Sequence, residues 1–282
     1  MKIAGIQVKC SDDIDKNFNQ IMKYLKIAIE KDTKIICFQE LSFYPWIPLE
    51  INDDNFSLAH SENDEIFAEI KKISKDSKSV IIIPFFEKSE IHGNFYNSAM
   101  VIEDGKIIGK YRKVHLPLIP GWEEKYYFKQ GNLGFPVFET KYGKIGLMIG
   151  WDIFFPEVSR ILTIKGAEII FAPTASAFSS QPRWLKIIGA NALMNTIFIA
   201  RINRIGKEKD IEFYGGSFCF APDGGLLSEP AGETEGIIFW EINYDDIFEV
   251  RRLFPFLKDR VEKEYLEIAG LDYNKIGVKN EL

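Results

Sequence analysis

The chain has 282 residues, 46% of them hydrophobic, and a formal net charge of -6 at pH 7. This allows one large domain or two ordinary ones with a substantial core. The longest apolar runs, such as residues 35–38, are far shorter than the roughly 20 residues that cross a bilayer, and the lysines form no basic stripe, which excludes a membrane-spanning protein and argues against a nucleic-acid partner.

The first part of the chain alternates strand and helix patterns. Apolar runs at residues 2–8 and 34–38 predict two short strands. The residues between them that recur at helical spacing are Ile14, Phe18, Ile21, Leu25 and Ile29. A second helix pattern at residues 66–73 precedes a run typical of a buried strand at residues 80–86. This region therefore reads as successive β-α-β units.

Antiparallel pairing is expected next. Residues 94–102 and 106–110 predict two strands joined at Asp104-Gly105, a dipeptide suited to a tight hairpin because glycine tolerates positive φ. After a loop rich in proline and glycine, residues 144–149 predict a strand that enters a sharp turn. Pro156 then suits the first position of a helix.

The remaining pattern completes an α/β domain. A helix is expected at residues 184–195, and strands are expected at residues 168–172, 196–203, 216–220, 225–228 and 236–242. Because no Ser/Gly linker or low-complexity tract interrupts this alternation, it favours a single mixed-sheet domain over residues 1–282. From about residue 244 to 282 the chain is charged and aromatic, which is typical of an arm rather than a core.

Cysteine and histidine usage predicts free thiols and no metal. Three cysteines cannot all pair with one another, and Cys37 lies inside an apolar strand run. The three histidines, His60, His92 and His115, lack zinc-ligand spacing. Residues 1–6 run into a strand pattern without a charged leader, so we expect a cytoplasmic location, and we expect no cofactor.

Three charged residues lie where chemistry is common, although each has an ordinary alternative. Glu40 follows the strand at residues 34–38, and open α/β sheets place ligands at carboxyl strand ends, but a solvated acid also fits there. Lys113 ends the second hairpin strand and would equally be a surface cation. Glu124 lies among aromatic residues that would raise the pKa of a buried carboxyl group, or in an exposed charged loop.

The segment from Ile149 to Glu157 is a strand followed by a sharp turn into a helix. A nucleophile at such a turn is held exposed, and the next backbone N–H, here that of Trp151, can donate to an oxyanion. Gly150 has no side chain to use. From the turn alone, a glycine that provides an unusual backbone angle is the simpler interpretation.

Taken together, these motifs resemble the nitrilase superfamily of carbon–nitrogen hydrolases, which is marked by Glu, Lys and Cys in that chain order. Glu40 resembles the general base of the family, Lys113 its lysine, and Glu124 its second glutamate. Gly150 stands where the family has its cysteine nucleophile. The resemblance extends to about residue 268 and includes residues 96–99, 203–206 and 214–218.

The resemblance also implies an architecture, an assembly and substrate contacts. The fold would be a four-layer α-β-β-α sandwich, and the protein would be a homodimer or larger, with residues 254–265 crossing between subunits. The backbone of Trp151 would bind the oxyanion, and the side chains in contact with substrate would be Trp122, Asp152 and Phe154.

Residues 120–128, 203–208 and 258–260 look most like those of carbamoyl amidases. The partner expected from this resemblance is a small-molecule N-carbamoyl amine or amide, with a nitrile still open. Residues 191 and 194 depart from the pattern, because many superfamily members carry Arg and Glu there and this chain carries Asn and Met.

Gly150 predicts that the chain as it stands is inactive. In an intact relative the glutamate would take the thiol proton and the thiolate would attack the carbonyl or nitrile carbon. We expect no substitute, because Cys37 and Cys219 read as small core residues. The alternative is a natural, non-catalytic protein that binds a small molecule.

Overall fold

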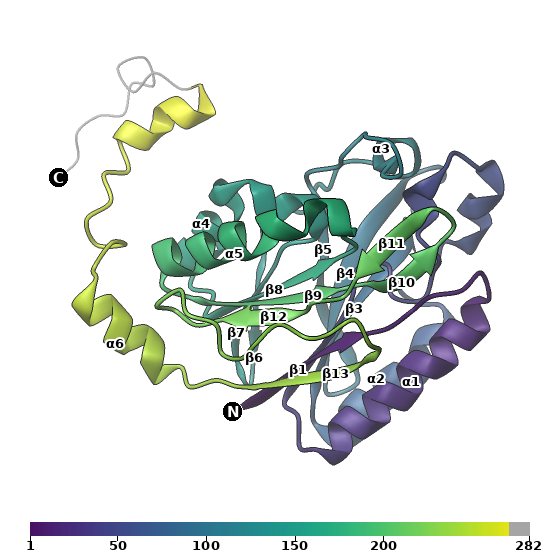
Figure 1. The fold of residues 1–282 in the computed structure, drawn as a ribbon, viewed down its shortest axis with the longest axis horizontal. Coiled ribbons are helices and arrows are strands. Elements are labelled where there is room, and N and C mark those ends of the chain that lie inside the picture. The colour runs from purple at the N-terminus through teal and green to yellow at the C-terminus, as the bar shows by residue number, and fades with distance from the viewer. Residues whose placement is uncertain (271–282) are drawn as a thin grey trace.

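The computed structural model describes residues 1–270, in which two β-sheets lie face to face between two layers of helices (Figure 1). The strand orders are β13-β1-β2-β3-β4-β5 and β12-β9-β8-β7-β6. The four-layer α-β-β-α sandwich is therefore confirmed. The chain forms two sheets rather than the single mixed sheet that the alternation alone favoured, since alternation identifies strands without showing which of them pair.

The first sheet combines parallel and antiparallel strands. Its strands are β1 (Lys2–Gln7), β2 (Ile35–Phe38), β3 (Val80–Lys88), β4 (Phe95–Glu103), β5 (Lys106–Arg112) and β13 (Gly236–Glu241). β1, β2 and β3 are parallel, and the crossovers between them contain α1 (Ile14–Glu30) and α2 (Ala68–Ser77). α1 begins where the Asp13 side chain accepts a hydrogen bond from the Lys16 backbone N–H, an N-cap that satisfies an end of the helix.

The second sheet repeats this arrangement. Its strands are β6 (Val137–Thr140), β7 (Gly143–Leu147), β8 (Ile169–Thr174), β9 (Phe198–Asn203) and β12 (Phe218–Phe220). β7, β8 and β9 are parallel, and their crossovers contain α4 (Pro156–Ile164) and α5 (Gln181–Asn195). Carboxyl ends of parallel strands from both sheets thus supply loops to one site.

Apolar side chains fill three interfaces between the four layers. Between the sheets, Ile82 and Val101 of the first sheet share a buried cluster with Phe171 and Phe198 of the second. A second cluster joins α1 and α2 to the outer face of the first sheet, and a third joins α4 and α5 to the outer face of the second. Apolar burial at these three interfaces fixes the two sheets relative to each other.

Several short elements differ from the sequence prediction. β10 (Ile205–Glu208) and β11 (Ile211–Tyr214) form a hairpin that the sequence analysis did not predict. The charged residues of its turn are typical of a loop. The strand predicted at residues 225–228 is wrong, because only an isolated bridge forms there, between Phe220 and Leu226. The short 3-10 and α elements are η1 (Ile47–Leu49), η2 (Asp53–Leu58), η3 (Glu65–Phe67), α3 (Glu124–Tyr127), η4 (Gly150–Phe154), η5 (Phe178–Ser180) and η6 (Glu264–Ala269).

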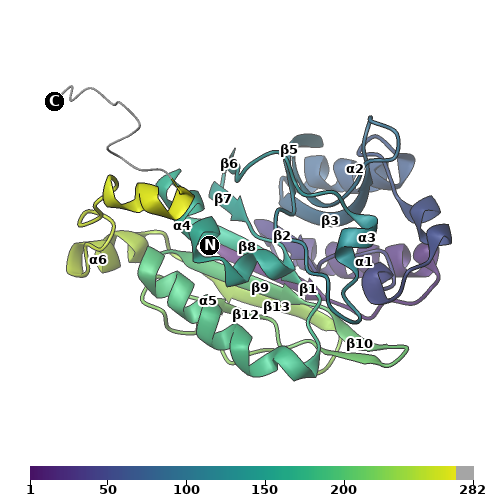
Figure 2. The same cartoon turned by 90° about the horizontal axis from the view of Figure 1, so that it is seen from above.

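The chain leaves the two sheets after β13. α6 (Asp245–Leu253) and the segment that follows it lie at the end of the molecule opposite to the β10–β11 hairpin (Figures 1 and 2). Phe248 is 66% exposed and Ile268 is 70% exposed. The predicted arm runs from about residue 244 to 282, and its part after residue 270 lies outside the described residues.

None of the helices within residues 1–270 has both the length and the apolar character needed to cross a bilayer.

Candidate active site

A cavity of about 460 Å³ opens at the carboxyl ends of three parallel strands. Glu40 lies two residues after β2, Gly150 lies three residues after β7, and Ala175 directly follows β8. Carboxyl ends of parallel strands are the usual ligand site of α/β sheets, and the volume suits a small molecule. The first and second sheets therefore both contribute to one pocket.

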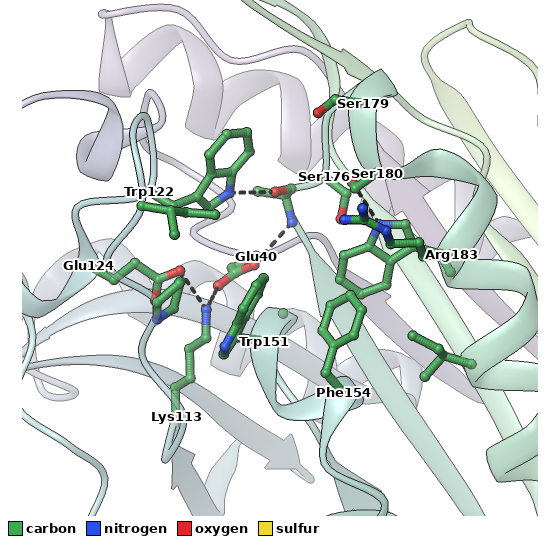
Figure 3. Close-up of a pocket in the computed structure, with 16 residues that line it drawn as sticks. Glu40, Lys113, Trp122, Glu124, Trp151, Phe154, Ser176, Ser179, Ser180 and Arg183 are labelled. Carbon is green, nitrogen blue, oxygen red and sulfur yellow. Dashed lines mark hydrogen bonds and ion pairs between the residues drawn. The ribbon is translucent and has the colours of Figure 1, made fainter.

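Lys113 lies between two carboxylates at the base of this pocket (Figure 3). Its Nζ is 2.7 Å from Oε1 of Glu40 and 2.7 Å from Oε1 of Glu124, and all three side chains are buried. β5 ends one residue before Lys113, and Glu124 begins the short helix α3. The structure thus brings together the three charged residues that the sequence singled out separately.

The Glu40 carboxylate is held by two further donors. Asn97 Nδ2 donates to Oε1 at 2.8 Å, and the backbone N–H of Ala175 donates to Oε2 at 3.0 Å. The carbonyl of Ala175 accepts a hydrogen bond from the Trp122 indole at 3.1 Å. Arg204 donates to the carbonyls of Glu40 and Leu41. These contacts fix the carboxylate and leave it little freedom to rotate.

Burial dominates the electrostatics of this cluster. Burial raises the pKa of Glu124 to about 8, against the opposing effect of the Lys113 ammonium group. Burial alone would lower the pKa of Lys113, but the carboxylates of Glu124 and Glu40 together raise it. Oε2 of Glu124 is buried and has no hydrogen-bond partner among the described residues. Glu124 can therefore hold a proton near neutral pH and offer it to a ligand.

The raised pKa of Glu124 predicts a pH effect on stability. A carboxyl group whose folded-state pKa exceeds its ordinary value of 4.5 contributes stability that is present below pH 4.5 and lost as the pH rises through about 8. Glu124→Gln stays neutral throughout, so the stability of the variant relative to the unmodified protein should rise between about pH 5 and pH 8. Urea unfolding across this range measures the difference, and a constant or falling difference would contradict the assignment.

Gly150 faces the same cluster from the turn after β7. Its φ is +50°, in the left-handed region that glycine occupies without strain. A Cβ atom built on Gly150 would lie 2.7 Å from Oε2 of Glu40 and 2.8 Å from Nζ of Lys113. A side chain at this position would therefore project directly between the carboxylate and the ammonium group.

The structure places Asp152 behind this turn and not in the pocket wall. One carboxylate oxygen accepts from the Tyr111 hydroxyl at 2.8 Å and the Ile149 backbone N–H at 2.9 Å. The other accepts from the backbone N–H of His115 at 3.0 Å and lies 2.9 Å from its Nδ1. Asp152 is fully buried and does not line the pocket, in contrast to the predicted substrate contact, and its hydrogen bonds tie the turn to the end of β5 and the residues after it.

Aromatic side chains form the other walls of the pocket. Trp122 and Phe154, which were predicted to contact substrate, line it together with the Trp151 side chain. Phe154 also contacts Trp184 edge-on at a ring separation of 4.8 Å. These rings provide flat apolar surfaces for a ligand.

Sequence reasoning missed the outer end of the pocket. The residues there come from the loop after β8 and from the first turn of α5, and they are Ser176, Ser179, Ser180 and Arg183. Their position after a parallel strand was a usable signal. Asn97 was also missed as a partner of Glu40, although its motif, residues 96–99, was part of the resemblance.

The three cysteines are free and none lines this pocket. Burial raises the pKa of Cys10 to about 11 and also raises the pKa of Cys37 and of Cys219. A thiol with a raised pKa is a poor nucleophile at neutral pH. Within residues 1–270, no group of three or more His, Cys, Asp or Glu side chains is arranged to hold a metal ion.

The fold and the Glu–Lys–Glu cluster define a carbon–nitrogen hydrolase of the nitrilase superfamily. The sequence model of the carbon-nitrogen hydrolase family matches residues 2–252, so the chain belongs to this family. The resemblance inferred from the sequence motifs is confirmed.

Relatives in the same family are similar to this chain over nearly its whole length. The chain is 34% identical to N-carbamoylputrescine amidase of Arabidopsis thaliana, over 96% of both proteins. It is 30% identical to citrullinase of Francisella tularensis, over 95% of this chain and 98% of the relative. The structure of a carbon-nitrogen hydrolase from Helicobacter pylori G27 superimposes with a TM-score of 0.88 at 34% identity, over 95% of this chain and 99% of that one.

Proposed function

We propose that this pocket is built to hydrolyse the non-peptide C–N bond of an N-carbamoyl amine or small amide, through Glu40, Lys113 and a thiol at position 150. The observation that carries the proposal is the backbone position of Gly150, at which a Cβ atom would lie within 3 Å of both Glu40 and Lys113. Similarity to N-carbamoylputrescine amidase and citrullinase supports the carbamoyl or amide substrate.

With a cysteine at position 150, the chemistry would proceed in two stages. Glu40 would take the thiol proton, and the thiolate would attack the carbonyl carbon to form a C–S bond. Lys113 and the Trp151 backbone N–H would stabilise the oxyanion. The C–N bond would then break, and the nitrogen would leave as an amine or ammonia with the proton from Glu40. Water activated by the carboxylate would hydrolyse the thioester and regenerate the thiol.

The same proposal holds that the chain as it stands is catalytically inactive. Gly150 supplies no nucleophile, and none of the three buried or half-buried thiols lines the pocket where a substrate would meet Glu40. Loss of a nucleophile with its partners retained leaves only the effects of binding and oxyanion stabilisation.

Gly150→Cys is expected to confer hydrolysis and to cost stability. A left-handed φ strains a residue with a Cβ by about 1–3 kcal/mol. The Cβ would also lie within about 3 Å of the hydrogen-bonded ends of Glu40 and Lys113, so these side chains must shift slightly from their present positions. Ammonia release from a panel of N-carbamoyl amines and amides measures the activity. A folded Gly150→Cys protein that hydrolyses none of them would contradict the proposal, and Gly150→Ser is the matched control because its hydroxyl is a weaker nucleophile.

A non-catalytic binding function is the second candidate. The observation that favours it is the unstrained glycine turn, which leaves an intact pocket of about 460 Å³. Under this function the unmodified protein would be stabilised by an N-carbamoyl compound without consuming it, in a thermal-shift assay followed by ligand quantification. Release of product, or a covalent adduct on Cys37 or Cys219, would exclude it.

We also propose that the protein forms a homo-oligomer and is cytoplasmic. Exposed apolar side chains on α6 and the segment after it, such as Phe248 and Phe254, support a homodimer or larger in which the arm is covered. Free cysteines support a reducing, cytoplasmic location. The partner that the pocket suits is a small molecule.

A further inference from the structure

The outer end of the pocket carries a positive charge that no protein group neutralises among the described residues. Arg183 is exposed, lines the cavity, and forms no ion pair or hydrogen bond within residues 1–270. Figure 3 shows Lys113 and Glu124 towards one end of the pocket and Arg183 towards the other. A ligand that reaches from the charged cluster to the opening would meet this guanidinium group.

Among the charged residues that line the pocket, Arg183 is the one whose charge no neighbouring group among the described residues balances. The charged residues of the lining are Glu40, Lys113, Glu124 and Arg183. Burial raises the pKa of Glu124 and favours its protonated form, and the Glu40 carboxylate balances the Lys113 ammonium group. The base of the pocket is therefore close to neutral, and its outer end is cationic.

The position of Arg183 in α5 is unfavourable unless an anion binds there. Arg183 is the third residue of this 15-residue helix, whose first turn contains no acidic residue. A cation at a helix N-terminus is repelled by the helix dipole. An anion there is attracted by the helix dipole and by the Arg183 guanidinium group. The free guanidinium group and the helix terminus thus favour the same sign of ligand charge.

Hydroxyl groups complete this end of the pocket. Ser176 is 3% exposed, lines the cavity, and its Oγ has no hydrogen-bond partner among the described residues. A buried hydroxyl without a partner costs free energy, which a bound acceptor would recover. Ser179 and Ser180 also line the cavity, but the Ser180 hydroxyl already donates to the Ala177 carbonyl and accepts from the Trp184 indole. The unpartnered Ser176 hydroxyl and the Arg183 guanidinium group thus line one cavity, and donors of these two kinds suit the oxygens of a carboxylate.

We infer that the substrate carries a carboxylate at the end opposite its scissile C–N bond, and that Arg183 selects it. The substrate class is then an N-carbamoyl or amide derivative of an amino acid, not of a diamine. This inference rests on the proposed function and narrows it. Arg183 acts as a specificity-determining residue and takes no part in bond breaking.

A diamine derivative is the competing substrate class. Its terminal ammonium group would find aromatic faces in Trp122, Trp151 and Trp184, which attract cations. It would also lie in a pocket whose unbalanced charge is positive, with both lining carboxyl groups already bound to Lys113. Repulsion by Arg183 therefore disfavours it.

Three ligands of matched length separate these classes. They are 4-ureidobutanoate, butylurea and N-carbamoylputrescine, which end in a carboxylate, a methyl group and an ammonium group. Titration calorimetry with the unmodified protein measures binding without turnover, because Gly150 supplies no nucleophile. The carboxylate ligand should bind about tenfold or more tightly than butylurea, as expected for one charge-assisted contact, and its advantage should shrink as salt is added.

Variants on one helix assign the effect to Arg183. Arg183→Gln should abolish the preference for the carboxylate ligand, and Arg183→Glu should transfer it to N-carbamoylputrescine. Lys186→Gln removes an exposed positive charge from the same helix outside the pocket lining and should keep the preference. Equal or tighter binding of the neutral or cationic ligand, a preference that survives Arg183→Gln, or no binding of any of the three would overturn the inference.

Hydrolysis of a simple amide by Gly150→Cys is a separate readout for the proposed function. If that variant cleaves small uncharged amides while the ligand series shows no carboxylate preference, the inference about Arg183 fails and the proposed function stands. If the variant cleaves nothing, the proposed function fails whatever the ligand preference.

Discussion

Replacing Glu40 by Gln in the Gly150→Cys protein is expected to lower kcat by about 10² to 10⁴-fold. The amide cannot take the thiol proton, so the thiol stays protonated and weakly nucleophilic. Gln keeps the shape of the side chain and a carbonyl oxygen for Asn97 and Lys113. Steady-state ammonia release, with folding checked by circular dichroism, gives the comparison.

The control for this substitution is Glu50→Gln, an equally isosteric change at an exposed carboxylate that pairs with Lys209 and lies outside the pocket lining. It should leave kcat within about twofold of the parent value, since exposed ion pairs contribute little. A Glu40→Gln protein that retains the kcat of its parent would show that another group takes the thiol proton, and the assignment of the base would be wrong.

Lys113→Met is expected to destabilise the unmodified protein by about 3–5 kcal/mol at pH 7, the usual cost of removing one partner from a buried ion pair. Met keeps most of the apolar stem but leaves the carboxyl groups of Glu40 and Glu124 buried beside each other without a cation. Urea unfolding measures the loss. Because protonation relieves this repulsion, the loss should be smaller at pH 5 than at pH 8.

Lys141→Met provides the comparison, because the ion pair of Lys141 with Asp104 is largely exposed and should contribute less than about 1 kcal/mol. If Lys113→Met cost no more than Lys141→Met, or cost the same at both pH values, the two carboxylates would not depend on Lys113. The claim that the Lys113 ammonium group stabilises the two buried carboxyl groups would then be wrong.

The helices and strands could be predicted from the sequence because the spacing of apolar residues shows which face of an element is buried. Ile14 to Ile29 marked α1, and Asp104-Gly105 marked the hairpin between β4 and β5, where both residues adopt positive φ. The pairing of strands into two sheets was not accessible in this way, because it depends on contacts between residues far apart in the chain. The family resemblance supplied it.

The sequence also predicted the residues of the inner part of the pocket, but only one by one and without showing how they lie relative to one another. Each of Glu40, Lys113 and Glu124 had an ordinary surface interpretation. That interpretation is removed only by their burial, with Nζ of Lys113 2.7 Å from an oxygen of each carboxyl group. Asp152 was expected at the substrate, but sequence proximity to Gly150 does not show which way a side chain points in a tight turn. Arg183 was missed because an isolated arginine has no pattern.

The most direct test of the central claim, that position 150 is the nucleophile position of an intact pocket, is the covalent intermediate itself. Gly150→Cys protein quenched in acid during turnover of an N-carbamoyl or amide substrate should gain the mass of one acyl group. Peptide mapping should place that group on the introduced cysteine, and the unmodified protein should gain none. An adduct on Cys10, Cys37 or Cys219, or hydrolysis by the variant with no acyl group at position 150 under quench conditions that preserve thioesters, would contradict the claim.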